Sequence, residues 1–108
     1  MATRPIVDEW FELTRKVMPS LAAERGWPVR FDHCFQRILL DNAVGAKWTT
    51  MIASPAYRNA SDTQIAEAIA LGRAAVSDTL DLAELNRRSL TWRGKAKKPA
   101  PRNGKRAS

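Results

Sequence analysis

The residues best suited to chemistry stand together at Asp32-His33-Cys34, where a base lies beside a thiol. A cysteine nucleophile needs a nearby base that can take its proton. Adjacent residues on a helix, however, point about 100° apart, so His33 and Cys34 would not face each other. Cys34 also falls on the apolar stripe of its helix, where a buried thiol is an inert packing group. We therefore expect a structural Cys34 and no catalytic residue.

Metal and phosphate chemistry lack the residues that they need. The chain has one histidine and one cysteine, which cannot supply the full ligand set of a structural zinc without several carboxylates. The stretch Val44-Gly45-Ala46-Lys47 contains a single glycine and does not provide the backbone amides of a phosphate-binding loop. The sequence therefore predicts no metal site and no cofactor.

A second set of polar residues recurs at helical spacing. His33, Arg37 and Asp41 follow one another every four positions and would line one side of a helix. One interpretation is a solvated face with an Arg37–Asp41 pair, which contributes roughly 0.3–0.5 kcal/mol. The other is a polar binding surface that also recruits side chains from a later loop, with the members His33, Arg37, Asp41, Asn42, Tyr57 and Arg58.

Helical periodicity organises the chain that carries these residues. Apolar side chains recur at helical spacing in several stretches, and no stretch has the convincing alternation of a strand. Residues 48–52 are expected to form a short turn and residues 54–60 a loop. The sequence therefore predicts an all-α fold, a compact bundle of about four or five short helices, with the main helices at 5–18, 32–45, 61–76 and 82–92.

Several residues predict how these helices begin, end and pack. Pro19 should kink or break the first helix, because proline lacks an N–H and clashes with the preceding turn. Two stretches match the capping-box pattern, Ser61 with Gln64 and Asp81 with Glu84. The tryptophans are expected to fill the core, because aromatic side chains dominate core packing; they are Trp10, Trp27, Trp48 and Trp92.

The net charge of +7 lies entirely at the C-terminal end of the chain. Residues 1–92 contain 11 Lys/Arg and 11 Asp/Glu, whereas residues 93–108 contain seven cations and no acid. The last segment is also rich in Pro and Gly and has only alanines as apolar residues, so it cannot offset its ordering entropy. We therefore expect a helical domain at 1–92 and a disordered basic tail at 93–108.

Such a tail is typical of arms that bind nucleic-acid phosphates without reading the sequence. A helix-turn-helix is a second route to the same partner, because a turn at 77–79 would let the last helix present Asn86, Arg87 and Arg88 to a groove. We predict a small non-enzymatic accessory protein that binds nucleic acid, DNA in preference to RNA, with low sequence specificity. The predicted contact residues are Arg87, Arg88, Arg93, Lys95, Lys97, Lys98, Arg102, Lys105 and Arg106.

Two other interpretations stay open. The helix at 61–76 carries only Glu67 and Arg73 as clear interior charges, so it could pack against a partner in a protein-interaction or regulatory module, including a homodimer. The basic tail could instead be a solubilising segment without a partner of its own.

The sequence also predicts where the protein works. The longest uncharged stretch with real apolar content has ten residues, 48–57, whereas a membrane span needs roughly 20. The N-terminus lacks the apolar core of a signal peptide, and a single cysteine excludes an internal disulfide. We expect a cytoplasmic protein without a membrane partner.

Residues 27–94 carry a pattern that resembles a family of small bacterial proteins. The pattern here is Phe31-Asp32-His33-Cys34-Phe35, Arg37, Leu40-Asp41-Asn42, Gly45, Trp48, Pro55-Ala56-Tyr57-Arg58, Leu85-Asn86, Ser89-Leu90 and Trp92-Arg93-Gly94. Members are often labelled GCN5-related N-acetyltransferases, so the resemblance implies acetyl transfer as a further alternative. It also implies a mixed α/β fold with a glycine-rich loop for coenzyme A, unlike the helices that periodicity predicts, and it assigns no catalytic residue to this chain.

Overall fold

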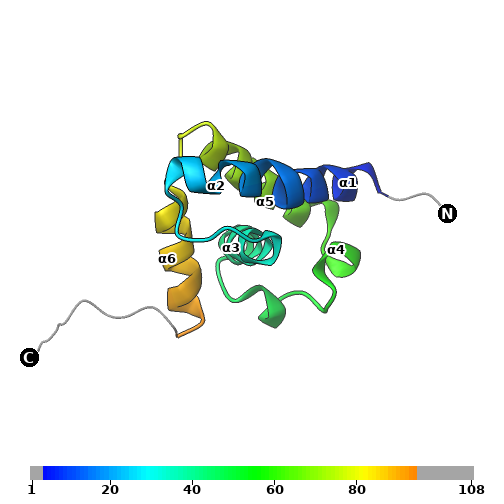
Figure 1. The fold of residues 1–108 in the computed structure, drawn as a ribbon. Coiled ribbons are helices and arrows are strands. Elements are labelled where there is room, and N and C mark those ends of the chain that lie inside the picture. Colours follow the sequence, from blue (N-terminus) through cyan, green and yellow to red (C-terminus); the bar gives the residue numbers. More distant parts are fainter. Residues whose placement is uncertain (1–3, 95–108) are drawn as a thin grey trace, which may run out of the picture.

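The computed structural model describes residues 4–94, and every regular element within that range is helical (Figure 1). An N-terminal rod consists of α1 (Pro5–Glu12), a π-helical stretch (Leu13–Val17) and α2 (Met18–Arg25). The rest of the chain forms α3 (Asp32–Val44), a 3₁₀ turn (Trp48–Thr50), α4 (Ala56–Asn59), α5 (Asp62–Val76) and α6 (Leu82–Trp92). The predicted all-α fold is confirmed, and the mixed α/β fold implied by the family resemblance does not occur in residues 4–94. The disordered tail is predicted from residue 93, but Arg93 is the C-terminal cap of α6 and contacts Asp41, so the prediction is wrong for this residue. Residues 95–108 of the predicted tail lie outside the described range.

The central element is α3, which Figure 1 shows nearly end on. The rod and α5 lie on one side of it, α6 crosses at another, and α4 lies on the side away from α6 (Figure 1). Phe35, Ile38 and Leu39 of α3 are fully buried, and burial of side chains of this size contributes roughly 1.5–3 kcal/mol each. Because the rod, α5 and α6 all pack on α3, this helix fixes the relative placement of these elements.

Side chains of the rod and of α3 pack closely against Gly72 of α5. A Cβ at this position would lie 2.6 Å from Cδ2 of Leu13 and 2.9 Å from Cδ1 of Leu39. Both distances are far below ordinary carbon contacts, so a side chain at this position would require the ends of the Leu13 and Leu39 side chains to move. Gly72 therefore leaves room for these two leucines in the core.

Of the kink or break predicted at Pro19, the break does not occur. The chain stays helical from Pro5 to Arg25, and the residues just before Pro19 form the π-helical stretch. A π-helical segment holds more residues per turn, and it gives the proline ring and its missing N–H a place without ending the helix. The structure thus replaces the predicted break with a local change of helical pitch.

The two predicted capping boxes have different outcomes. Ser61 and Gln64 form the predicted box, because the Gln64 N–H donates to Ser61 Oγ (3.1 Å) and the Ser61 N–H donates to Gln64 Oε1 (2.9 Å). Asp81 caps α6 by accepting a hydrogen bond from the Ala83 N–H (3.1 Å). Glu84, however, turns to two arginines of α6 and does not complete a box.

The tryptophans fill the core only in part. Trp10 is buried, and Trp27 and Trp48 pack half-buried against the core. Trp92 is 39% exposed, so the prediction is wrong for this residue. The buried residues of α6 are Leu82, Leu85 and Ser89. Arg93 follows Ser89 by four residues and turns toward α3, whereas Trp92 faces solvent.

Candidate functional site

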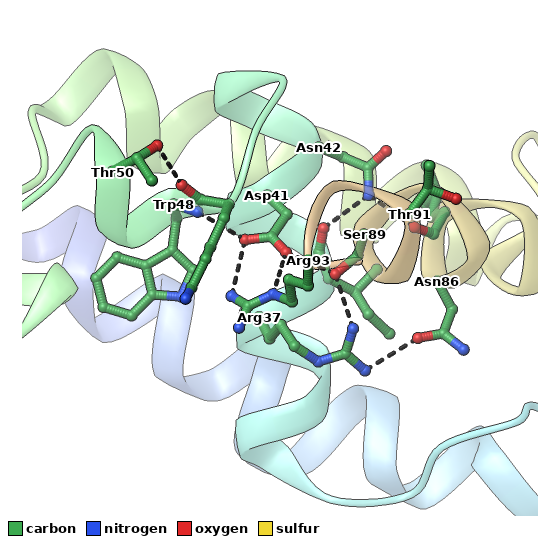
Figure 2. Close-up of polar contacts among 12 residues, drawn as sticks. Arg37, Asp41, Asn42, Trp48, Thr50, Asn86, Ser89, Thr91 and Arg93 are labelled. Carbon is green, nitrogen blue, oxygen red and sulfur yellow. Dashed lines mark hydrogen bonds and ion pairs between the residues drawn. The ribbon is translucent and has the colours of Figure 1, made fainter. Parts of the chain in front are cut away.

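The six residues predicted to form one polar surface lie in three places. Arg37, Asp41 and Asn42 face α6 and make contacts with it (Figure 2). His33 stands at the N-terminal end of α3 with 77% of its side chain exposed. Tyr57 and Arg58 belong to α4, on the side of α3 away from α6 (Figure 1). The spacing correctly places the first residues on α3, but it does not bring all six into one surface.

The carboxylate of Asp41 is fully buried and receives four hydrogen bonds (Figure 2). Arg93 makes a bidentate contact, from Nε to Oδ2 (2.6 Å) and from Nη2 to Oδ1 (3.0 Å). Ser89 Oγ donates to Oδ2 (2.6 Å), and the Trp48 N–H donates to Oδ1 (2.8 Å). Because a buried charge is tolerated only when it is paired and hydrogen-bonded, these contacts join α3 to α6 and to the 3₁₀ turn.

A second layer of polar contacts surrounds the Asp41 carboxylate. Arg37 donates from Nη1 to Ser89 Oγ (2.7 Å) and from Nη2 to Asn86 Oδ1 (2.9 Å). Asn42 donates from Nδ2 to the backbone carbonyl oxygen of Leu85 (2.9 Å). We call this set the α3–α6 clamp, and its side chains are Arg37, Asp41, Asn42, Asn86, Ser89 and Arg93 (Figure 2). The Arg37–Asp41 pair considered in the sequence analysis gives way to Arg93, which occupies the carboxylate.

The clamp is built to hold helices together and not to carry out a reaction at its serine. Ser89 is completely buried, and its hydroxyl donates a hydrogen bond to Asp41 and accepts one from Arg37. A serine nucleophile needs an exposed Oγ and a base positioned to remove its proton. Ser89 has neither exposure nor a histidine partner within residues 4–94, since His33 lies at the solvent-exposed end of α3. The geometry therefore gives the clamp a structural role.

The predicted nucleic-acid contacts divide between paired and undescribed residues. Arg93 is only 18% exposed and is held by Asp41. Arg87 and Arg88 both bind the Glu84 carboxylate, with nitrogen–oxygen distances of 2.6 Å and 3.1 Å. The remaining predicted contacts lie outside residues 4–94: Lys95, Lys97, Lys98, Arg102, Lys105 and Arg106.

The arginine pair changes the titration of Glu84. Hydrogen bonds from Arg87, and next from Arg88, lower the pKa of the Glu84 carboxyl from 4.5 to about 2. The same contact raises the pKa of the Arg87 guanidinium. Opposite charges within hydrogen-bond distance favour the charged form of each partner.

Two further places in the domain hold groups that are able to take part in chemistry. Cys34 is partly exposed and not buried as its apolar stripe predicted, and residues 4–94 contain no cluster of metal-ligating side chains. A shallow hollow of about 370 Å³ lies between α3 and α5 and is lined by Asn42, Ala43, Glu67, Ala70 and Leu71. Its Asn42 amide is already bonded to backbone carbonyls, which leaves Glu67 as its one ionisable group and no pair for acid–base work.

Comparison of the chain with family models, curated proteins and solved structures gave no significant match. Within residues 4–94, none of the helices has the length and apolar content that a membrane crossing requires.

The clamp predicts that Asp41→Asn strongly destabilises the domain. The amide keeps the shape of the side chain but leaves Arg93 without its counterion and turns an NH₂ group toward hydrogen-bond donors. Removal of one partner of a buried pair costs about 3–5 kcal/mol, which urea unfolding followed by circular dichroism would measure. The matched control is Glu9→Gln, because Glu9 pairs with Arg73 at the surface and such pairs contribute about 0–1 kcal/mol. Equal losses in the two variants would contradict a structural role for Asp41.

The lowered pKa of Glu84 predicts a pH-dependent contribution to stability. The unfolded chain protonates this carboxyl near pH 4.5, whereas the folded chain keeps it charged down to about pH 2. The stabilisation is therefore complete above pH 4.5 and disappears as the pH falls through about 2. Glu84→Gln should have a lower Tm than the unmodified protein at pH 6 and the same Tm near pH 2. Glu67→Gln on α5 is the control, and a pH-independent difference for Glu84→Gln would contradict the assigned pairing.

Proposed function

We propose that this protein is a non-enzymatic accessory protein of the cytoplasm that associates with nucleic acid through its cationic C-terminal segment. The proposal depends on one observation, namely that residues 93–108 hold seven cations and no acid next to a domain of zero net charge. Cations interleaved with Pro, Ala and Gly suit contacts with phosphates, which carry no sequence information. We further propose a preference for DNA over RNA and little sequence specificity.

The charge arrangement of the domain supports this assignment. Several of its arginines are paired with acids from other elements, including Arg4 with Asp62 and Arg25 with Asp78. Paired surface charges contribute little to the long-range field. The largest excess of positive charge is therefore in the segment that follows α6. Arg93 holds the clamp, so we assign the phosphate contacts to the six cations beyond it.

The physical basis of such binding is the release of counterions from the nucleic acid. Each phosphate neutralised on duplex DNA lowers the slope of log K against log salt by about 0.9. With about 4–6 phosphates neutralised, the expected slope is roughly −3.6 to −5.4. The binding would therefore be strong at low salt and weak at high salt.

Fluorescence anisotropy with a labelled DNA duplex over a salt series tests the proposal on the full-length chain. Replacing Lys95, Lys97, Lys98, Arg102, Lys105 and Arg106 by Gln should abolish binding and bring the slope close to zero. The control, Arg87→Gln with Arg88→Gln, should bind with nearly the original slope, because Glu84 already occupies these guanidiniums. Undiminished binding by the six-Gln variant would eliminate the proposal, and a matched RNA duplex tests the preference for DNA.

A second candidate function is self-association through α5, which the exposed face of this helix favours. Ala66 and Ala70 are exposed along it and Ala74 is half-buried, and small residues allow close helix approach. Glu67 and Arg73 lie three residues before and after Ala70. A two-fold antiparallel pairing centred on Ala70 would therefore set Glu67 of each copy against Arg73 of the other. The Arg73 guanidinium would then contact both Glu67 of the other copy and Glu9 of its own chain.

Light scattering at increasing protein concentration tests self-association. A single helix face buries less surface than the roughly 1,200 Å² of stable interfaces, so we expect a weak dimer that forms only at high concentration. Ala70→Glu places like charges at the crossing point and should give a monomer. Ala83→Glu, on the exposed side of α6, is the control and should not change the mass. A monomer at every concentration would eliminate this candidate.

A further inference from the structure

A continuous row of side chains runs over the surface from α4 to the N-terminal end of α3. We call it the aromatic row, and its members in spatial order are Tyr57, Phe11, Arg15, Asp32, His33 and Phe31. The rings of Tyr57 and Phe11 meet edge to face with their centroids 5.4 Å apart. The Arg15 guanidinium lies 3.7 Å over the Phe11 ring and reaches toward Asp32, with Nε 3.9 Å from Oδ2. The row thus connects three elements that are distant in sequence.

The end of the row at α3 is a stacked aromatic pair in solvent. The rings of Phe31 and His33 are nearly parallel, with an interplanar angle of 4° and centroids 5.8 Å apart. Phe31 is 64% exposed and the His33 side chain 77% exposed, so neither ring belongs to the core. At the other end Tyr57 is 38% exposed. The row therefore presents two aromatic platforms, one on either side of Arg15.

Arg15 has donors left for a ligand. Its side chain is 54% exposed, and its separation from Asp32 is longer than a hydrogen bond. Within residues 4–94 its guanidinium makes no other polar contact than this long one. Exposed arginines also adjoin both platforms in sequence, Arg30 before Phe31 and Arg58 after Tyr57. Cations therefore accompany the aromatic rings along the whole row.

We propose that the aromatic row binds an unpaired nucleic-acid strand, with bases stacked on Phe31 and Tyr57 and a phosphate between them bound by Arg15. Aromatic platforms alternating with cations are how proteins bind single strands without reading sequence. In a duplex the faces of the bases are covered by their neighbours, so the row would select unpaired nucleic acid. This proposal rests on the proposed function, because that function supplies nucleic acid as the class of ligand. The selectivity for unpaired strands comes from the aromatic row and not from the cationic segment.

The surroundings of the row favour a strand over a protein partner. Interface hot spots lie in desolvated pockets within a ring of contacts that exclude water. Phe31 has no such pocket, because its sequence neighbours Arg30 and Asp32 are charged and its ring neighbour His33 is exposed. An open platform with polar neighbours suits a flat base whose edges remain hydrated.

Anisotropy with labelled oligo(dT) and with a DNA duplex, both titrated with full-length protein, tests this inference. Phe31→Ala should weaken oligo(dT) binding at least about fivefold, since each stacked base contributes about this much or more, and should leave duplex binding unchanged. Tyr57→Ala should act in the same direction, and Phe31→Trp should restore binding. Met51→Ala is the control, because Met51 is equally exposed at 62% but lies outside the row, and it should change neither titration.

The two proposals fail in different ways in this experiment. If Phe31→Ala leaves oligo(dT) binding unchanged, or weakens oligo(dT) and duplex binding equally, the aromatic row is not a strand-binding surface. The nucleic-acid function can still stand in that case, supported by salt-sensitive duplex binding. If oligo(dT) binds through Phe31 while the duplex does not bind, the row stands and the cationic segment is not the main contact. If neither nucleic acid binds, both proposals are wrong.

Discussion

The buried carboxylate of Asp41 is the constraint on which the arrangement of this domain depends. A charge without solvent must find donors for both of its oxygens, and here they come from Ser89 and Arg93 of the α6 region and from the backbone of Trp48. Ser89 and Arg93 are distant from Asp41 in sequence, so the requirement can be met only when α6 crosses α3 at one position. Leu82 and Leu85 are buried on the apolar side of α6, but two leucines alone would allow several registers of α6 against α3. The carboxylate selects one of them.

This dependence explains what the sequence could and could not predict. Helix bounds follow from local patterns, and the helices predicted at 32–45, 61–76 and 82–92 agree closely with the observed α3, α5 and α6. The same periodicity put His33, Arg37 and Asp41 on one side of α3. It could not show that α6 covers this side near Asp41 and leaves it open near His33, because that depends on the packing of a helix more than 40 residues away. The charge count likewise assigned Arg93 to a free tail, because the number of cations in a segment does not show which of them pairs with an acid elsewhere in the fold.

The polar residues that carry the family resemblance can be interpreted in the same way. All six side chains of the α3–α6 clamp occur in that pattern, Arg37 and Asp41 among them. As sequence, these residues carry the resemblance to acetyltransferases without identifying a catalytic residue. In the folded chain these groups satisfy one another, and Ser89 and Asp41 have no contact with solvent. Fold specification is therefore a sufficient physical reason for the presence of these six residues.

The clamp and the aromatic row lie toward opposite ends of α3, and this places Arg93 at a defined separation from the row. Asp32 and Asp41 are nine residues apart on this helix, which corresponds to about 14 Å along its axis. Arg93 is fixed at Asp41, so the first cation of the C-terminal segment follows two residues after an anchored position. A strand with stacked bases advances about 3.4 Å per nucleotide and would cover this separation with about four nucleotides. Since a rigid helix sets the distance, a strand longer than this can engage both contacts at once, and each contact then raises the effective concentration of the other.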